Sequence, residues 1–267
     1  MIKTIGFILL STASWNAFSV PVDSEVLHRQ RIMHEQDKIP TIAAPIIKKI
    51  PIQESHEELI DLNALPDNAT NRRIKMMPDI DRSILGYHRA LHKYPSYVRK
   101  GLLLALQDMV LALPENIGIW VYEAYRPLDV QKKYFKNVKN RIQGKNPKLS
   151  KEEVYRLTSI EISSIENNVP VHCTGAAIDM TLIDLKSNLP LPMGKFSVLK
   201  GHNEVAKTYS KGLTKQELKN RKLLLAAASK AGLVNYPNEW WHFSIGDRYA
   251  AYFLGKQYAI YGIKVLP

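Results

Sequence analysis

Strand-like runs and helical patterns alternate irregularly along this chain, and their order restricts the fold more than composition does. The strand-like runs cover 58–65, 118–122, 177–182 and 239–245, and the helical patterns cover 95–113, 129–138, 215–231 and 250–261. A doubly wound fold would require helices and strands in a regular parallel rhythm, which this sequence lacks. We therefore expect a single α+β domain, with a mostly antiparallel central sheet flanked by helices.

The pattern over residues 95–113 is the most regular of the helical ones. Leu102 and Leu106 fall on one face, at the spacing of an amphipathic helix. Ser96 is a candidate N-cap, and Pro114 ends the pattern. We expect one helix across the whole range.

The first residues have the layout of a secretory signal peptide. Lys3 precedes a short apolar run at 5–10, and small and polar residues follow it. A buried N-terminal strand or helix is the alternative interpretation. The run is too short to span a bilayer, and no later stretch reaches the roughly 18 consecutive apolar residues that a membrane helix needs. We expect residues 1–19 to be removed on export to the periplasm or the outside of the cell.

The segment from 20 to 56 contains four prolines and no sustained hydrophobic period. Such a segment is typical of an N-terminal arm or linker that is partly ordered at best. The stronger patterns begin near residue 59, so we expect the folded domain to cover 57–267.

The formal net charge of +12 makes the chain strongly basic. Such a charge is compatible with nucleic acid, anionic lipid or an acidic polymer as partner. The lysines and arginines are spread along the sequence, with no helix-turn-helix, zinc-finger or aromatic-basic RNA pattern. We expect no nucleic-acid partner, and we interpret the charge as attraction to an anionic surface or as a source of solubility.

The single cysteine, Cys173, cannot form an internal disulfide, so the fold must depend on its core. Its position beside His172 makes it a possible extra metal ligand. A small buried side chain is the favoured interpretation, because adjacent residues rarely reach the same ion.

His172 and Asp179 are separated by a glycine and small residues. Such a segment can turn sharply, so that a loop histidine and a strand carboxylate converge on one point. Imidazole nitrogen and carboxylate oxygen are both ligands of catalytic zinc sites, which use three protein ligands and keep one position open. Taken alone, the pair is equally compatible with a turn or capping role for Asp179.

A second candidate group is the run Glu239-Trp240-Trp241-His242. If His242 completes a set of three metal ligands, Glu239 is close enough to exchange protons with a metal-activated water. The alternative is a surface acid and a core histidine beside two tryptophans. Consecutive strand residues face opposite ways, so we expect one tryptophan in the core and the other beside the site.

Arg126 follows the strand-like run at 118–122. A guanidinium at a strand end can bind a substrate carboxylate or stabilise the oxyanion of a tetrahedral intermediate. A surface salt bridge is the competing interpretation.

Read together, these pieces resemble the D-alanyl-D-alanine dipeptidases, zinc enzymes related to the D,D-carboxypeptidases that trim peptidoglycan. The resemblance covers roughly residues 57 to 263, so that 57–267 would be a zinc D,D-peptidase domain. Several blocks in the same order carry it, which is more specific than any single block. They are LIDLN at 59–63, YEAYRP at 122–127, PVHCTGAAIDMTL at 170–182, PMG at 192–194, NR at 220–221, GLVNY at 232–236 and EWWHFSIGD at 239–247.

The resemblance implies one zinc ion bound by His172, Asp179 and His242. Glu239 would act as general base and then as general acid, and Arg126 would steady the substrate or its tetrahedral intermediate. The implied substrate is a very small D,D-dipeptide in a confined cavity, where its charged ends would need polar partners.

Two segments depart from the family pattern. The family usually has an aspartate that helps to hold the substrate's amino end, whereas here Phe196 is followed by Ser197. Glu204 is a nearby acid that could substitute. The family's usual stretch is also replaced over 74–86, which changes one wall of the expected pocket. Substrate choice therefore stays open, whereas the metal chemistry does not depend on these positions.

Two other functions compete with a dipeptidase. A D,D-carboxypeptidase or endopeptidase acting on peptidoglycan stem peptides would use the same metal in a wider cleft. A non-catalytic module that binds the cell wall would be expected to have lost the base or a ligand, yet Glu239 and all three candidate ligands are present. The sequence does not indicate an oligomeric state.

Overall fold

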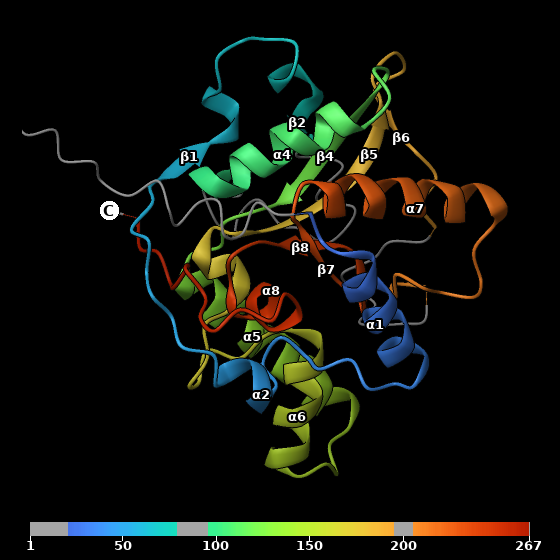
Figure 1. The fold of residues 1–267 in the computed structure, drawn as a ribbon. Coiled ribbons are helices and arrows are strands. Elements are labelled where there is room, and N and C mark those ends of the chain that lie inside the picture. The colour runs from blue at the N-terminus through green and yellow to red at the C-terminus, as the bar shows by residue number, and fades with distance from the viewer. Residues whose placement is uncertain (1–20, 79–95, 195–204, 267) are drawn as a thin grey trace, which may run out of the picture.

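The computed structural model describes residues 21–78, 96–194 and 205–266 (Figure 1). The expected signal peptide at 1–19 lies outside these ranges. So do Ser197, Glu204 and residues 79–86 of the divergent segment.

A six-stranded sheet forms the centre of the molecule, in the order β2-β4-β5-β8-β7 with β6 paired to β5 off this path. Its strands are β2 (Ile74–Met76), β4 (Ile117–Glu123), β5 (Ala177–Asp184), β6 (Leu189–Pro190), β7 (Val234–Tyr236) and β8 (Glu239–Ser244). The β2–β4 pair is parallel and the other pairs are antiparallel. The α+β class is confirmed, and the sheet is mixed, because the edge strand β2 enters it in the parallel direction.

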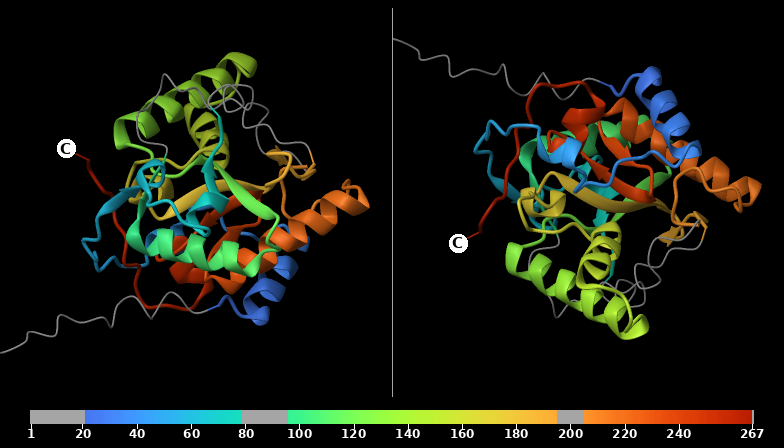
Figure 2. Two further views of the ribbon diagram at one scale, coloured as in Figure 1. Left: turned by 90° about the horizontal axis from the view of Figure 1, so that it is seen from above. Right: turned by 90° about the horizontal axis from the view of Figure 1, so that it is seen from below.

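Helices cover both faces of the sheet. They are α1 (Ser24–Glu35), α2 (Pro45–Lys48), α4 (Lys100–Ala112), α5 (Leu128–Lys145), α6 (Lys151–Glu161), α7 (Lys215–Lys230) and α8 (Arg248–Phe253). Figure 2 shows α4 and α7 on one side of the sheet and the α5–α6 pair on the other. Coverage of both faces explains why nearly every residue of β4 and β5 is buried.

The α4 helix forms as its sequence predicts, but it begins later than expected. Leu102 and Leu106 are fully buried on its inner face. Residues 97–99 form the strand β3 (Tyr97–Arg99), which pairs antiparallel with β1 (Leu59–Asp61). Ser96 is therefore not the helix cap, and its hydroxyl instead donates to Asp61 Oδ1 at 2.6 Å. The last helical pattern is also shorter than expected, since α8 ends at Phe253.

The N-terminal segment, expected to be an arm or linker, contains the helices α1 and α2, which both pack on the domain. Gln30 of α1 is buried, and its Nε2 donates to Asn235 O of the edge strand β7 at 3.0 Å. Ile47 of α2 is buried with residues of α8. Short 3-10 turns at Leu62–Ala64, Asn71–Arg73 and Val171–Thr174 complete the described elements. Within these ranges, no helix combines the length and apolar character that a membrane crossing requires.

Candidate metal centre

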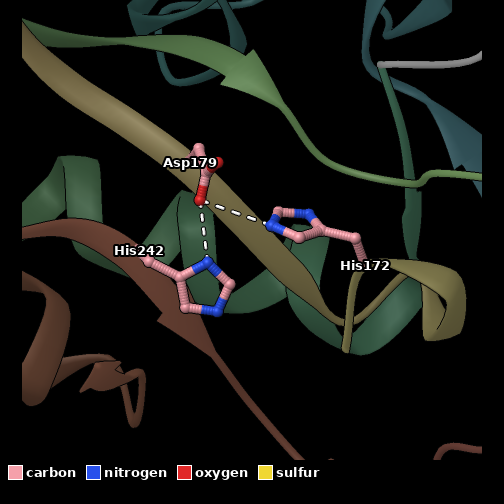
Figure 3. Close-up of side chains that lie close together, drawn as sticks. All are labelled: His172, Asp179 and His242. Carbon is pink, nitrogen blue, oxygen red and sulfur yellow. Dashed lines mark hydrogen bonds and ion pairs between the residues drawn. The ribbon is translucent and has the colours of Figure 1, made fainter. Parts of the chain in front are cut away.

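Three side chains from three separate elements converge at one point of the sheet (Figure 3). His172 lies in the 3-10 turn Val171–Thr174, Asp179 on β5 and His242 on β8. Asp179 and His242 are directly paired in the β5–β8 register, which places them side by side. The candidate ligand atoms of the three residues all lie within 4.8 Å of one another. The three side chains that the sequence singled out are thus brought together.

The orientation of His172 is fixed by its backbone surroundings. Its Nδ1 lies 2.7 Å from Ala124 O. Because a carbonyl oxygen only accepts hydrogen bonds, Nδ1 carries the proton and donates. The other ring nitrogen, Nε2, faces Asp179 Oδ1 at 3.4 Å. A histidine held in this way at one nitrogen presents the lone pair of the other, which is the usual arrangement of a metal-binding imidazole.

His242 approaches Asp179 from the opposite side. Its Nδ1 lies 2.8 Å from the same carboxylate oxygen, Oδ1. The two imidazole rings have centroids 4.9 Å apart and are inclined at 74°. The three residues thus offer two nitrogens and one oxygen around a common point.

Burial and charge both act on this group. His172, Asp179 and His242 are only 6%, 3% and 3% exposed. Burial by itself would raise the pKa of Asp179, but the charges and hydrogen bonds of the two histidines hold it well below its usual range. Burial would lower the pKa of His242, and the hydrogen bond and charge of Asp179 raise it instead. The carboxylate therefore stays ionised, and two nitrogens with one oxygen form a donor set that fits zinc.

Glu239 stands at the start of β8, three residues before His242. Its Oε2 lies 3.8 Å from His242 Nδ1, and its side chain is 18% exposed. It is thus next to the three clustered residues, on the side that water can reach.

Arg126 is buried at the end of β4 and is held on several sides. Its Nε donates to Glu123 Oε1 at 2.9 Å, and a second nitrogen pairs with the other oxygen of the same carboxylate. Its third nitrogen donates to Gln131 Oε1 at 2.7 Å, and the guanidinium lies 4.8 Å from the centre of the Tyr134 ring. Its backbone N–H donates to His172 O at 3.0 Å, so the arginine is tied to the turn that carries His172.

Comparison with known proteins adds an independent line of evidence. The family model described as D-ala-D-ala dipeptidase matches residues 98–260, which is more than half of the chain. This chain belongs to that family. It is 31% identical to a D-alanyl-D-alanine dipeptidase of Synechocystis sp. over 178 residues, covering 58% of this chain and 71% of the relative. It is 28% identical to a D-alanyl-D-alanine dipeptidase of Enterococcus faecium over 147 residues, covering 53% and 69%.

Membership in the D-ala-D-ala dipeptidase family makes this chain a peptidase. The matched range contains the clustered residues His172, Asp179 and His242, together with Glu239 and Arg126. The site described above therefore lies within the part of the chain that the family shares.

Three residues that surround Arg126 were not singled out from the sequence of this family member. They are Glu123, Gln131 and Tyr134. For Glu123, a signal was present: it is the one acid in an otherwise apolar strand, and it lies three residues before the arginine. Burial would lower the pKa of Arg126, but the charge of Glu123 raises it above its usual range.

Cys173 and the two tryptophans contribute to the core of this family member. Cys173 is buried, and among the described residues it does not belong to the cluster of His172, Asp179 and His242. Burial raises its pKa to about 12, so the thiol stays protonated at neutral pH. Trp240 and Trp241 are both buried in the main core, whereas we expected only one of them there.

Proposed function

We propose that this peptidase is a zinc-dependent dipeptidase that hydrolyses D-alanyl-D-alanine or a similar small D,D-dipeptide. The observation that supports it best is the convergence of His172, Asp179 and His242 within 4.8 Å in a chain of the D-ala-D-ala dipeptidase family. Two relatives carry the name D-alanyl-D-alanine dipeptidase.

The three clustered residues would hold one zinc ion. The ligand atoms would be His172 Nε2, Asp179 Oδ1 and His242 Nδ1, and three protein ligands are the number found in catalytic zinc sites. When bound, zinc lowers the pKa of a coordinated water to about 7 and polarises a peptide carbonyl.

Glu239 is the proton carrier in this proposal. Its carboxylate stands beside His242 and is partly exposed, so it can accept a proton from the attacking water. The same carboxyl group then protonates the leaving amine, which completes the cleavage of the peptide bond.

Arg126 binds negative charge on the substrate. Its guanidinium is held in one orientation by Glu123 and Gln131, so no reorganisation is needed when charge develops on the peptide oxygen. Because Glu123 balances its charge, the guanidinium acts through N–H groups that are already oriented toward the substrate.

One sequence departure favours a second candidate substrate. Ser197 stands where the family usually has an aspartate for the substrate's amino end. A chain without that carboxylate would discriminate less against substrates whose amino end is blocked. Stem peptides of peptidoglycan are such substrates, so a D,D-carboxypeptidase or endopeptidase is the alternative.

The test combines a peptide panel with one substitution. The purified protein is loaded with one equivalent of zinc and assayed on D-Ala-D-Ala, L-Ala-L-Ala and a stem pentapeptide. We expect D-Ala-D-Ala to be cleaved fastest, whereas preference for the pentapeptide would support the alternative. A protein that binds zinc but cleaves none of the three would favour a non-catalytic wall-binding role.

The substitution Glu239→Gln removes the proton carrier and keeps the size of the side chain. We expect it to retain zinc and to lose about 100-fold or more in kcat, the usual range for a general base. Glu115→Gln, at an exposed acid of the same type, is the matched control and should leave kcat unchanged. If Glu239→Gln hydrolyses peptides as fast as the parent, the role given to Glu239 is wrong.

A further inference from the structure

Arg99 is a fully buried arginine outside the metal centre. Its side chain is 0% exposed, and it lies in β3, immediately before α4. Burying a guanidinium is costly unless its charge is balanced and its N–H groups are bonded. Its partners therefore show what the residue is built to hold.

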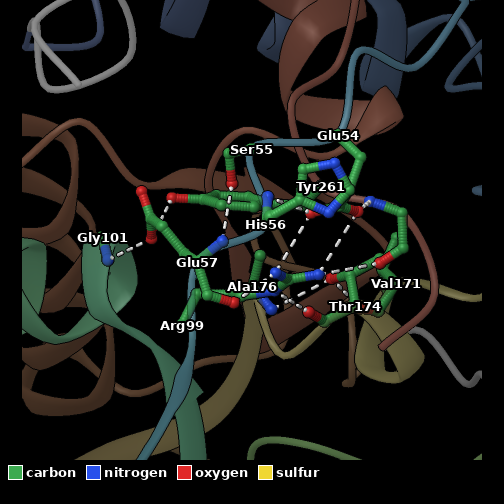
Figure 4. A network of polar contacts seen from close by, with 11 residues as sticks. Glu54, Ser55, His56, Glu57, Arg99, Gly101, Val171, Thr174, Ala176 and Tyr261 are labelled. Atoms are coloured by element: carbon green, nitrogen blue, oxygen red, sulfur yellow. Dashed lines mark hydrogen bonds and ion pairs between the residues drawn. The ribbon is translucent and has the colours of Figure 1, made fainter. Parts of the chain in front are cut away.

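Every nitrogen of the Arg99 guanidinium has at least one hydrogen-bond acceptor (Figure 4). Nε donates to Thr174 O at 2.7 Å, and the first terminal nitrogen donates to Glu57 O at 2.7 Å. The second terminal nitrogen donates to Gly262 O at 3.3 Å. Glu54 lies 3.1 Å from the first terminal nitrogen and 3.4 Å from the second. Four hydrogen bonds and an ion pair thus hold the planar guanidinium, and a lysine could not make all of these contacts.

Arg99 makes two contacts with the turn that carries His172. The side chain of Arg99 binds Thr174 O, and its backbone N–H binds Gly175 O at 2.7 Å. The turn is held from its other end by Ala124 O, which accepts from the His172 ring, and by the backbone N–H of Arg126. The His172 imidazole is thus fixed between two anchors, of which Arg99 is one.

The charge partner of Arg99 comes from outside the part of the chain that the family shares. Glu54 precedes the matched range 98–260, and its side chain is 25% exposed. The carboxylate also accepts from Gly262 N at 2.6 Å, while Glu57 accepts from Gly101 N and from the Tyr261 hydroxyl, each at 2.9 Å. The N-terminal segment, β3 and the C-terminal residues therefore meet at Arg99.

We infer that Arg99 and Glu54 are positioning residues for metal binding. The Glu54–Arg99 pair holds the turn 171–175 so that His172 Nε2 faces Asp179 and His242 before a metal ion arrives. This inference rests on the proposed zinc site. It means that Glu54, which precedes the range matched by the family, helps to form that site.

The test measures zinc affinity, by competition with a chromophoric chelator, on protein stripped of metal. Glu54→Gln keeps the shape of the side chain and removes the counter-charge, and Arg99→Lys keeps the charge and removes the planar guanidinium. Loss of a group that orients a metal ligand typically weakens metal binding 10- to 100-fold. We expect a loss of about 10-fold for Glu54→Gln and a larger loss for Arg99→Lys.

The matched control is Glu35→Gln, which removes the same charge from an exposed pair with Arg31 in the N-terminal segment. It should bind zinc as the parent does. Circular dichroism shows which variants are folded, and hydrogen exchange of residues 171–176 reports the turn directly. If Arg99→Lys does not fold, Glu54→Gln decides, because its side chain is partly exposed.

Weaker zinc binding by folded Glu54→Gln, together with faster exchange in the turn, would support the inference. Zinc binding within twofold of the parent would overturn it, even if the melting temperature falls, because the network would then stabilise the fold alone. A parent protein that binds no zinc would instead overturn the proposed function and this inference with it.

Discussion

A single oxygen of Asp179 faces both histidines of the candidate metal centre, at 2.8 Å from His242 and 3.4 Å from His172. The sequence could single out these three residues because the blocks that contain them occur in the order that the resemblance to the family requires. Arg99 could not be singled out, since an arginine is read as exposed unless its acceptors are known. All of its side-chain acceptors come from residues more than 40 positions away, which no local pattern shows.

The contribution of Asp247 to the stability of the fold depends on pH. It is buried, and its Oδ1 caps α8 by accepting from Ala250 N at 2.7 Å. Burial raises the pKa of Asp247 from 3.8 to about 6, against the effect of its hydrogen bonds. Because the folded pKa is the higher one, folding favours the protonated carboxyl. The stability that this provides is present below about pH 4 and is lost as the pH rises to about 6.

The variant Asp247→Asn cannot ionise and keeps an oxygen that can cap the helix. Relative to the parent, its free energy of unfolding should rise between pH 4 and pH 6 by up to about 3 kcal/mol and then stay level. Urea denaturation of metal-free protein across this range measures the difference. Asp108→Asn, at an exposed acid on α4, should show no such rise. A difference that is independent of pH would contradict the role given to Asp247.

At the scale of elements, the turn that carries His172 depends on Gly175. This glycine has φ of +74°, a conformation that other residues rarely adopt. A Cβ at this position would lie 2.3 Å from Leu59 Cδ2, closer than any real contact. Both observations favour glycine at this position of the turn.

We expect Gly175→Ala to lower the free energy of unfolding by about 2 kcal/mol or more, from backbone strain and overpacking together. Gly144→Ala is the matched control, because it lies in α5 with no atom within 4 Å of the added Cβ. In a helix, alanine is favoured over glycine by about 1 kcal/mol, so the control should be slightly stabilised. Chemical denaturation compares the two, and equal effects would contradict this account of the turn.

The long elements were predictable and the short ones were not. The patterns over 177–182 and 239–245 correspond to β5 and β8, because strands of six to eight residues are long enough to show a local sequence pattern. The strand β3 was missed, because its three residues lie within a helical pattern and pair with β1 at a distance in sequence. The polar helix α1 shows no clear apolar stripe and is held by contacts such as that of Gln30.

At the scale of the whole molecule, the N-terminal segment is part of the folded unit rather than a separate arm. Gln30 bonds to the edge strand β7, Ile47 packs beside α8, and Glu54 reaches Arg99. These contacts join residues that are more than 40 positions apart. They depend on the complete fold, which is why composition alone suggested a linker.

We propose that the protein is exported and loses its first residues. The layout of Lys3, the apolar run at 5–10 and the following small residues supports this. N-terminal sequencing of protein recovered outside the cytoplasm should find a start shortly after Ala17 or Ser19. Replacing two leucines of the run, Leu9 and Leu10, with Asp should abolish export. Recovery of the full-length chain in the cytoplasm alone would contradict export.

The most direct test of the whole account is the binding of zinc at the three clustered residues. Metal analysis and zinc titration compare the parent with Asp179→Asn and with Asp184→Asn, a control five residues further along β5. The account predicts one zinc per parent and per control molecule, and binding weakened at least 100-fold in Asp179→Asn. A parent that binds no zinc, or an Asp179→Asn variant that binds it as tightly as the parent, would contradict the metal centre.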